Sequence, residues 1–305
     1  MPITIATRKS PLALWQCSQV AQALQAQHKG LEIKILKLTS LGDEICDRPL
    51  REVGGKALFV STLEQALLEK RADIAVHSLK DVPCVLEPLF SLSAILAHGA
   101  REDVLLSKRY ASLQDLPNNA SIGTCSLRRG AQLLHHQKDF NIQSIRGNIQ
   151  TRIAYIEDDR LDAIIIAKAA LERLDIRSYH QVVLEPSTML AAPGQGAIAI
   201  EVLAENTHAY DLSCSLNHTQ SATIAHTERA ICAKLACDCH SPIACYGTIN
   251  HDTITVHCKI FSIDGKTVIE SHMSTAVHTA SDLVEAIAKD LLQKGARALL
   301  DAASK

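Results

Sequence analysis

The stretch from Gly123 to Arg152 reads G-T-C-S-L-R-R-G-A-Q-L-L-H-H-Q-K-D-F-N-I-Q-S-I-R-G-N-I-Q-T-R. Short apolar runs alternate in it with helical patterns, so we expect strands over 121–123 and 142–145 and helices over 127–137 and 149–157. This alternation predicts an α/β lobe, in which ligands bind outside the carboxyl ends of the strands. Four arginines lie beside the turns at those ends, namely Arg128, Arg129, Arg146 and Arg152.

The N-terminal part of the chain repeats this organisation. A-T-R-K-S-P-L-A (6–13) and G-T-C-S-L-R-R-G-A (123–131) both lead from a strand into a helix that begins with serine. R-A-D-I-A-V (71–76) and R-L-D-A-I-I-I (160–166) both end a helix and open a strand. We therefore expect two related α/β lobes. Their further predicted strands cover 3–6, 33–38, 73–77, 104–107 and 162–167, and their further predicted helices cover 12–27 and 63–70.

From about Thr219 the pattern changes. A helix over 222–235 precedes a Cys-rich loop, three β-rich runs (244–249, 253–261 and 266–272) and an amphipathic helix from Ser281 onward. Strands in a meander together with helices predict a small α+β third domain.

The charge balance limits the kind of ligand. The chain has 31 basic and 33 acidic residues, a formal charge of −2. A local group of arginines in such a chain indicates a bounded anion rather than nucleic acid. The chain contains no apolar run of the roughly 18 residues that a membrane helix needs. No signal peptide is recognisable, so we expect a cytoplasmic protein with mostly reduced thiols.

The helix starts favour an anion site. Ser126 is expected to cap its helix, which places Arg128 and Arg129 in the first turn, where the helix dipole disfavours cations. Arg8 lies just before the Ser10 helix start in the same way. A bound anion would offset this repulsion and meet free backbone N–H groups. The alternative is a set of solvated surface arginines.

Two further segments hold candidate functional residues. V-H-S-L-K-D-V-P (76–83) ends a buried strand with Lys80 and Asp81, and Asp81 could stabilise a cation or move a proton. The alternative is a helix-capping aspartate beside a solvated lysine. V-G-G-K-A-L-F-V (53–60) lies in a long turn-rich segment, a candidate lid, and lacks the spacing of a P-loop.

The loop L-A-C-D-C-H-S-P-I (235–243) allows three interpretations. Cys237, Cys239 and His240 could bind zinc, but a C-x-C-H cluster lacks the well-spaced second ligand pair of structural zinc sites. A cysteine in an exposed loop could instead be reactive or modified. The third interpretation is a loop thiol without function.

Taken in order along the chain, these motifs resemble those of the porphobilinogen deaminase (hydroxymethylbilane synthase) family. The resemblance runs through I-A-T-R-K-S-P-L-A-L-W-Q, V-G-G-K-A-L-F, R-A-D-I-A-V-H-S-L-K-D-V-P, G-T-C-S-L-R-R, R-G-N-I-Q-T-R, P-G-Q-G-A-I-A-I-E and the Cys239 loop. It covers almost the whole chain. It implies two α/β lobes like those of periplasmic binding proteins and a small α+β C-terminal domain. The expected boundaries are 1–97 with 197–216, 102–192, and 219–305.

The resemblance also implies an activity. The family joins four porphobilinogen molecules into hydroxymethylbilane and releases ammonia from each, in tetrapyrrole and haem biosynthesis. One dipyrromethane cofactor per chain is attached through a thioether, and Cys239 matches the attachment position. The resemblance implies a monomer whose partner is the small substrate, with no resident metal and no nucleic acid or membrane partner.

The site residues follow from the same resemblance. Asp81 matches the catalytic aspartate, and Lys56 and Phe59 lie in the mobile active-site loop. The groups expected to hold carboxylates of cofactor and substrate are Arg8, Ser10, Lys80, Thr124, Ser126, Arg128, Arg129, Arg146 and Arg152. Arg173 and Gln195 match positions that line the cleft.

A few residues depart from the family pattern. Cys125 replaces a serine, Cys237 and Asp238 replace glycines, and Lys168 replaces a small apolar residue. None of these changes touches Asp81, Cys239 or the arginines, so we expect an active enzyme. Two other classes stay open from the residues alone, a non-enzymatic anion-binding protein and a zinc-dependent regulator.

Overall fold

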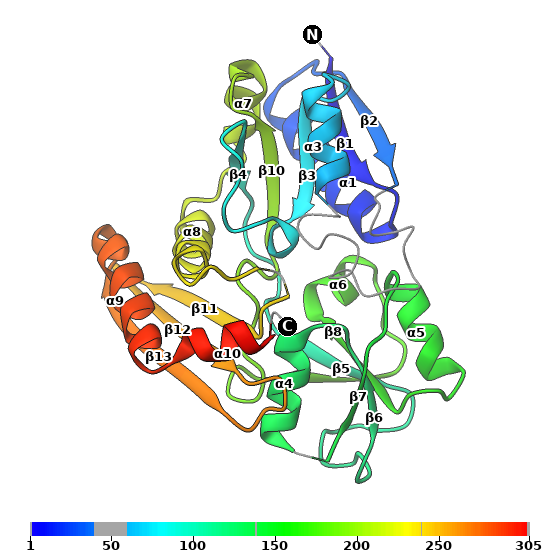
Figure 1. Cartoon of the computed structure of the whole chain (residues 1–305). Helices are drawn as coiled ribbons and strands as arrows, with labels where there is room; N and C mark the ends of the chain where they lie inside the picture. Colours follow the sequence, from blue (N-terminus) through cyan, green and yellow to red (C-terminus); the bar gives the residue numbers. More distant parts are fainter. Residues whose placement is uncertain (1, 40–59, 138, 239, 304–305) are drawn as a thin grey trace. The chain divides into compact units, whose positions relative to one another are not determined.

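The computed structural model describes residues 2–39, 60–137, 139–238 and 240–303. The chain forms two compact units (Figure 1). Unit 1 is Met1–Gly99 with Gln195–Thr223, and unit 2 is Ala100–Gly194 with Ile224–Lys305. Lobe 2 and the C-terminal region share one unit, and the predicted boundaries of three domains stay a prediction. No described helix is long and apolar enough to cross a membrane.

Unit 1 is built on a five-stranded sheet in the order β2-β1-β3-β10-β4. Strands β1, β2 and β3 are parallel, whereas β10 is antiparallel to both of its neighbours. The strands are β1 (Ile3–Arg8), β2 (Ile33–Leu38), β3 (Ile74–Ser78), β4 (Phe90–Ile95) and β10 (Ile198–Leu203). The helices are α1 (Pro11–Gln27), α3 (Ser61–Leu68) and α7 (Thr207–Cys214), and a 3-10 turn, Leu79–Asp81, follows β3.

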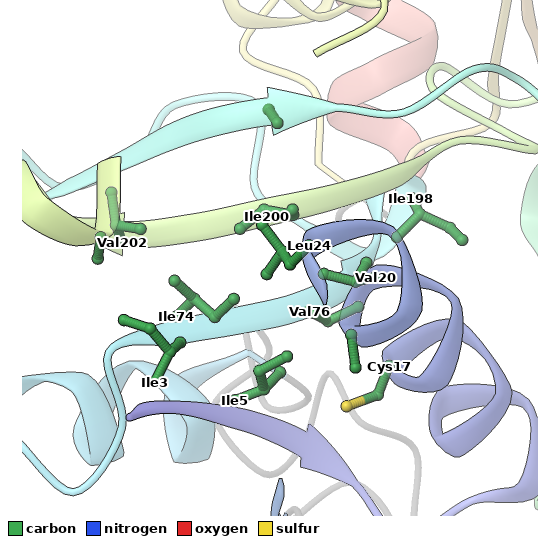
Figure 2. Close-up of a cluster of buried hydrophobic side chains, with 13 residues drawn as sticks. Ile3, Ile5, Cys17, Val20, Leu24, Ile74, Val76, Ile198, Ile200 and Val202 are labelled. Carbon is green, nitrogen blue, oxygen red and sulfur yellow. The ribbon is translucent and has the colours of Figure 1, made fainter. Parts of the chain in front are cut away.

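One face of this sheet is closed by α1. Val20 and Leu24 of the helix point toward Ile74 of β3 and Ile200 of β10, all almost fully buried (Figure 2). Burying one such side chain stabilises the fold by roughly 1.5–3 kcal/mol. A second cluster, which includes Leu63 and Leu67 of α3, is also buried. The packing fixes where the strands end, and hence where their end residues lie.

Unit 2 contains a second sheet, in the order β7-β6-β8-β5-β9. Its strands are β5 (Asp103–Ser107), β6 (Ser121–Gly123), β7 (Asn141–Gln143), β8 (Ala163–Ala167) and β9 (His180–Leu184). Strands β6, β7 and β8 are parallel and β5 is antiparallel, so the pattern of unit 1 recurs. The helices are α4 (Leu127–His136), α5 (Ile149–Glu157) and α6 (Lys168–Arg173).

Hydrogen bonds confirm that the two lobes are related. The Asp73 carboxylate accepts the backbone N–H of Thr4 (2.7 Å), and the Asp162 carboxylate accepts that of Ser121 (2.9 Å). In each lobe the aspartate that opens one parallel strand thus caps its neighbour. The predicted caps of α1 and α4, Ser10 and Ser126, are also confirmed.

The C-terminal part of unit 2 is a three-stranded antiparallel sheet with helices. Its strands are β11 (Ile243–Asn250), β12 (Thr253–Phe261) and β13 (Val268–Ala276), in the order β11-β12-β13. Helix α8 (Thr219–Lys234) leads into this part of the chain, and α9 (Ala280–Gln293) and α10 (Ala296–Ala303) complete it. The amphipathic helix predicted from Ser281 onward is confirmed as α9, but it ends at Gln293 and a separate helix, α10, follows. Gly295 takes a positive φ of 95° and separates the two helices.

The hairpin between β12 and β13 packs against α4 at Gly265. A Cβ atom there would lie 2.5 Å from the backbone nitrogen of His135, and φ is 69°. The His135 ring also hydrogen-bonds the Gly265 carbonyl (2.8 Å). Only glycine fits this close approach without strain.

Candidate active site

Unit 1 gathers five predicted site residues at one edge of its sheet. Arg8 ends β1 and Ser10 caps α1, whereas Lys80 and Asp81 lie in the 3-10 turn after β3. Strands β1 and β3 are parallel neighbours, so their carboxyl ends meet at the same edge. All four residues are partly exposed. Gln195 lies in the turn before β10, and its Oε1 is 3.5 Å from Lys80 Nζ.

The turn that carries Asp81 is held from two sides. The Leu79 N–H donates to the Ala197 carbonyl (3.1 Å), which ties the turn to the segment before β10. The Gln16 side chain on α1 donates to Ser78 Oγ (2.9 Å). Asp81 is therefore presented on a backbone fixed by the sheet and by α1.

Unit 2 presents its predicted residues in the same way. Thr124 and Ser126 follow β6. Arg146 follows β7 and Arg152 lies in the first part of α5, the next helix, and Arg173 lies in α6 after β8. These three strands are parallel neighbours, so the five residues share one edge. Burial lowers the pKa of Arg173. The Arg152 side chain donates to the Gly147 carbonyl (2.9 Å).

Arg128 and Arg129 share one buried carboxylate, that of Asp103 at the start of β5. Arg128 Nη2 donates to Asp103 Oδ2 (2.7 Å), and Arg129 Nη2 donates to Oδ1 (2.7 Å). Arg129 Nε also donates to Asp103 Oδ1 (3.2 Å). Both arginines bond backbone carbonyls as well, Arg128 that of Leu190 (2.6 Å) and Arg129 that of Ile165 (3.1 Å). Burial lowers the pKa of Arg128.

This arrangement changes how the two arginines can act. Both are almost fully buried, at 4% and 6% exposed, rather than solvated on the surface. Two guanidinium groups against one carboxylate leave a net positive charge among these three side chains. The excess charge lies in the first turn of α4, beside the Ser126 cap. A carboxylate ligand suits such a site because it would offset the charge and accept the N–H groups of the helix start.

Sequence reasoning missed Asp103. Its only signal is an aspartate that opens an apolar strand, as Asp73 and Asp162 also do. Those two cap a neighbouring strand, whereas Asp103 binds arginines 25 and 26 residues away in the sequence.

Three predicted residues lie outside the described part of the chain: Lys56, Phe59 and Cys239. Near Cys239, the described Cys237 is buried and follows Ala236, which has a positive φ of 54°. Of the other departures from the family pattern, Cys125 is exposed beside Thr124, and Lys168 is partly exposed at the start of α6.

Unit 1 also contains a cluster of three titratable side chains, His77 of β3, Glu201 of β10 and Glu64 of α3. His77 Nε2 is 3.0 Å from Glu201 Oε2, and both side chains are almost inaccessible to solvent. Burial, with the charge of Glu201 next in importance, raises the pKa of Glu64 on α3 to about 7. His77 is part of this cluster and lies one strand position before Ser78, so the sequence motif 76–83 serves both the core and the sheet edge.

No group of three or more His, Cys, Asp or Glu residues within the described ranges is arranged to hold a metal ion.

Residues 3–211 match the porphobilinogen deaminase dipyrromethane cofactor binding domain, and residues 222–293 match the porphobilinogen deaminase C-terminal domain. The chain belongs to the porphobilinogen deaminase family.

The activity and cofactor that the sequence resemblance implied are thereby confirmed. The chain is a hydroxymethylbilane synthase of tetrapyrrole biosynthesis and uses a dipyrromethane cofactor. The donor set of the described residues fits such a group, because acidic side chains on pyrrole rings call for guanidinium, hydroxyl and helix-start N–H donors. The fold class, two α/β lobes and a small α+β C-terminal part, is confirmed as well.

Two solved structures are similar to parts of this chain. The VFT2 domain of Bordetella pertussis BvgS is 14% identical, with 74% of this chain and 93% of that chain covered and a TM-score of 0.45. An amino acid ABC transporter substrate-binding protein from Streptococcus pneumoniae, bound to L-arginine, is 12% identical, with 74% and 90% covered and a TM-score of 0.42.

Proposed function

We propose that Asp81 is the catalytic carboxylate and that Cys239 carries the dipyrromethane cofactor. The observation that supports this most directly is the position of Asp81, in a turn at the carboxyl edge of the unit 1 sheet. The same edge brings together Arg8, Ser10, Lys80 and Gln195. Cationic and hydroxyl groups around one partly exposed carboxylate suit a substrate that carries acids and also develops positive charge.

The arginines would hold carboxylates. Porphobilinogen carries two acidic side chains, and a planar guanidinium can grip each through two parallel hydrogen bonds. In unit 2 the net positive charge of Arg128, Arg129 and Asp103 supports this role. Thr124, Ser126, Arg146, Arg152 and Arg173 lie at the same sheet edge and would hold further carboxylates.

Asp81 would act on the substrate as it loses ammonia. The C–N bond breaks, ammonia leaves, and the methylene carbon and pyrrole ring share a positive charge. A carboxylate stabilises that charge and accepts the pyrrole N–H. After the new carbon–carbon bond forms, Asp81 would help to remove the proton from the ring carbon. The dipyrromethane cofactor, when bound, supplies the terminal pyrrole carbon to which the first substrate is joined.

We further propose that the enzyme works in the cytoplasm as a monomer with porphobilinogen as its partner. We also propose that the chain is divided into three domains, which are 1–97 with 197–216, 102–192 and 219–305. Lys56 and Phe59, which match the family's active-site loop, would exclude water during the reaction.

Intact mass spectrometry of the purified protein tests the attachment site. We expect an adduct of two linked pyrroles, lost in Cys239→Ser and retained in the neighbouring control Cys237→Ser. Asp81→Ala should retain some cofactor and lose most porphobilinogen turnover. An adduct that persists in Cys239→Ser would refute the attachment site, and full turnover by Asp81→Ala would refute the catalytic role.

A further inference from the structure

Unit 2 contains a group of buried thiols that the reaction does not use. Cys232 lies near the end of α8, Cys245 in β11 and Cys258 in β12, and Cys237 follows α8. All four are buried thiols, and Cys245 and Cys258 have no exposed surface. We call Cys232, Cys245 and Cys258 the thiol trio.

Backbone geometry brings these cysteines together. At the end of α8 the Cys237 N–H donates to the Cys232 carbonyl (2.9 Å), and Ala236 takes the left-handed conformation. This helix cap typically packs the residue at position 237 against the one at 232. In the sheet, Cys245 of β11 stands directly opposite Cys258 of β12.

The pairing of Cys245 and Cys258 sets their separation. The Cys245 N–H donates to the Ala191 carbonyl (3.0 Å), so it points away from β12. The two cysteines therefore form a non-hydrogen-bonded pair, for which the Cα atoms are about 4.5 Å apart. That spacing lies within the range of about 4.4–6.8 Å that a disulfide spans.

Cys245 is the centre of the trio. Its thiol is hydrogen-bonded to the thiols of both Cys232 and Cys258. The bond with Cys232 lowers the pKa of Cys245, but the bond with Cys258 and burial together raise it well above its ordinary value. Cys245 and Cys258 are therefore protonated at neutral pH and react slowly, although the thiols of Cys232 and Cys258 both lie within hydrogen-bonding reach of Cys245.

We propose that the thiol trio is an oxidation site in which Cys245 forms a disulfide with either Cys232 or Cys258. The oxidant is a hydroperoxide. One thiol sulfur gives two electrons to the peroxide, the O–O bond breaks, and the products are a sulfenic acid and water. The neighbouring thiol then displaces the hydroxyl group, which leaves as a second water with the thiol proton. Overall, two thiols and one hydrogen peroxide give one disulfide and two waters.

A disulfide within the thiol trio would constrain the chain on either side of Cys239. Helix α8 ends at Lys234 and β11 begins at Ile243, so these elements flank the loop in which Cys239 occurs. A bond between Cys232 and Cys245 would close a ring around that loop, and one between Cys245 and Cys258 would fix the start of the hairpin. The link to the cofactor rests on the proposed role of Cys239, whereas disulfide formation does not.

Peptide mapping of the oxidised holoenzyme tests the proposal. The full chain, with its cofactor attached, is treated with hydrogen peroxide at neutral pH and sampled over time. Remaining thiols are alkylated in denaturant, and the protein is digested without reductant. Because trypsin leaves Cys245 and Cys258 in one peptide, chymotrypsin, which cuts after Tyr246, is needed to separate them.

We expect a cross-linked peptide that contains Cys245 joined to Cys232 or Cys258, with a mass about 2 Da below the sum of its reduced parts. Reductant should abolish it. The exposed Cys125 should oxidise earlier and so marks the progress of the treatment. The proposal is overturned if the trio remains fully alkylatable after Cys125 has reacted, or if it forms only sulfinic acids or intermolecular bonds.

Matched variants separate the trio from ordinary buried thiols. Cys245→Ala should abolish the cross-link, whereas Cys17→Ala should leave it unchanged. Cys17 is a buried thiol in α1 of unit 1, and burial raises its pKa to about 11. If Cys245→Ala does not fold, Cys232→Ala and Cys258→Ala provide the same test, because each should leave only the cross-link to the remaining neighbour. Loss of the adduct in Cys239→Ser tests the proposed function separately.

Discussion

Replacement of Asp103 by asparagine should destabilise unit 2 and weaken cofactor retention. Asp103 has no exposed surface and accepts three hydrogen bonds from Arg128 and Arg129, at 2.7, 2.7 and 3.2 Å. Asparagine keeps one carbonyl oxygen but presents an NH₂ group to the second arginine. Donor then faces donor, and two buried guanidinium groups lose their counter-charge.

The size of the effect follows from burial. Removing one partner from a buried ion pair costs about 3–5 kcal/mol, because the other charge stays buried without compensation. We expect a loss of about 4 kcal/mol in the free energy of unfolding. The matched control is Asp159→Asn in the same lobe, because Asp159 pairs with Lys108 at the surface. An exposed pair of this kind contributes about 0–1 kcal/mol.

Urea unfolding followed by far-UV circular dichroism measures both variants. Trp15, the only tryptophan, lies in α1 of unit 1, so its fluorescence reports on the unit that the substitution does not alter. Intact mass gives the fraction of chains that retain cofactor. The reasoning is refuted if Asp103→Asn costs less than about 1 kcal/mol, the ceiling for an exposed pair.

Two further substitutions test features of the two lobes. Folding raises the pKa of Glu64 from 4.5 to about 7, so the folded state binds more protons between these values and its stability falls as pH rises through this range. Glu64→Gln should therefore add about 1 kcal/mol to the free energy of unfolding above pH 7 and nothing below about pH 4.5. The figure allows for the solvent screening of a half-buried group. An equal gain at both pH values in urea titrations would contradict this. Gly265→Ala should lower the unfolding free energy by about 2–4 kcal/mol, because it adds a clash with α4 to the strain of a positive φ. The control is Gly295→Ala, because Gly295 also has a positive φ but an added Cβ would meet only ordinary contact at 3.9 Å. This variant should lose about 1–2 kcal/mol of unfolding free energy. Equal losses in the two variants would argue against the packing of the hairpin on α4.

The sequence predicted those parts of the fold that depend on local chemistry. The Ser10 and Ser126 caps, the strand over Ile33–Leu38 and the helix over Ile149–Glu157 are confirmed because each is specified by neighbouring residues. Periodicity also predicted the parallel strands of both lobes. Strands β4 and β9 and helices α6 and α7 were missed, since short elements carry too few residues for a clear period.

Only part of the candidate site could be predicted from the sequence. Residues that follow strand ends could be found from the chain alone, because parallel strands share an edge wherever they are placed in the sheet. The partner of Arg128 and Arg129 could not, because β5 reaches α4 only through tertiary packing. The same applies to Cys245, whose neighbours Cys232 and Cys258 come from a different helix and a different strand. The roles of Asp81, Cys239 and the arginines stay predictions.

The position of β10 has a consequence for the order in which the chain can fold on the ribosome. Among the strands that the structure describes, β4 pairs with β10 alone, yet residues 96–197 are synthesised between them. At roughly 5–20 residues per second, β4 waits about 5–20 s for its partner. The described strands of the five-stranded sheet in unit 2 all lie between Asp103 and Leu184. The lobe that the ribosome begins second can thus complete its sheet first, while the first lobe still exposes the edge that β10 will cover.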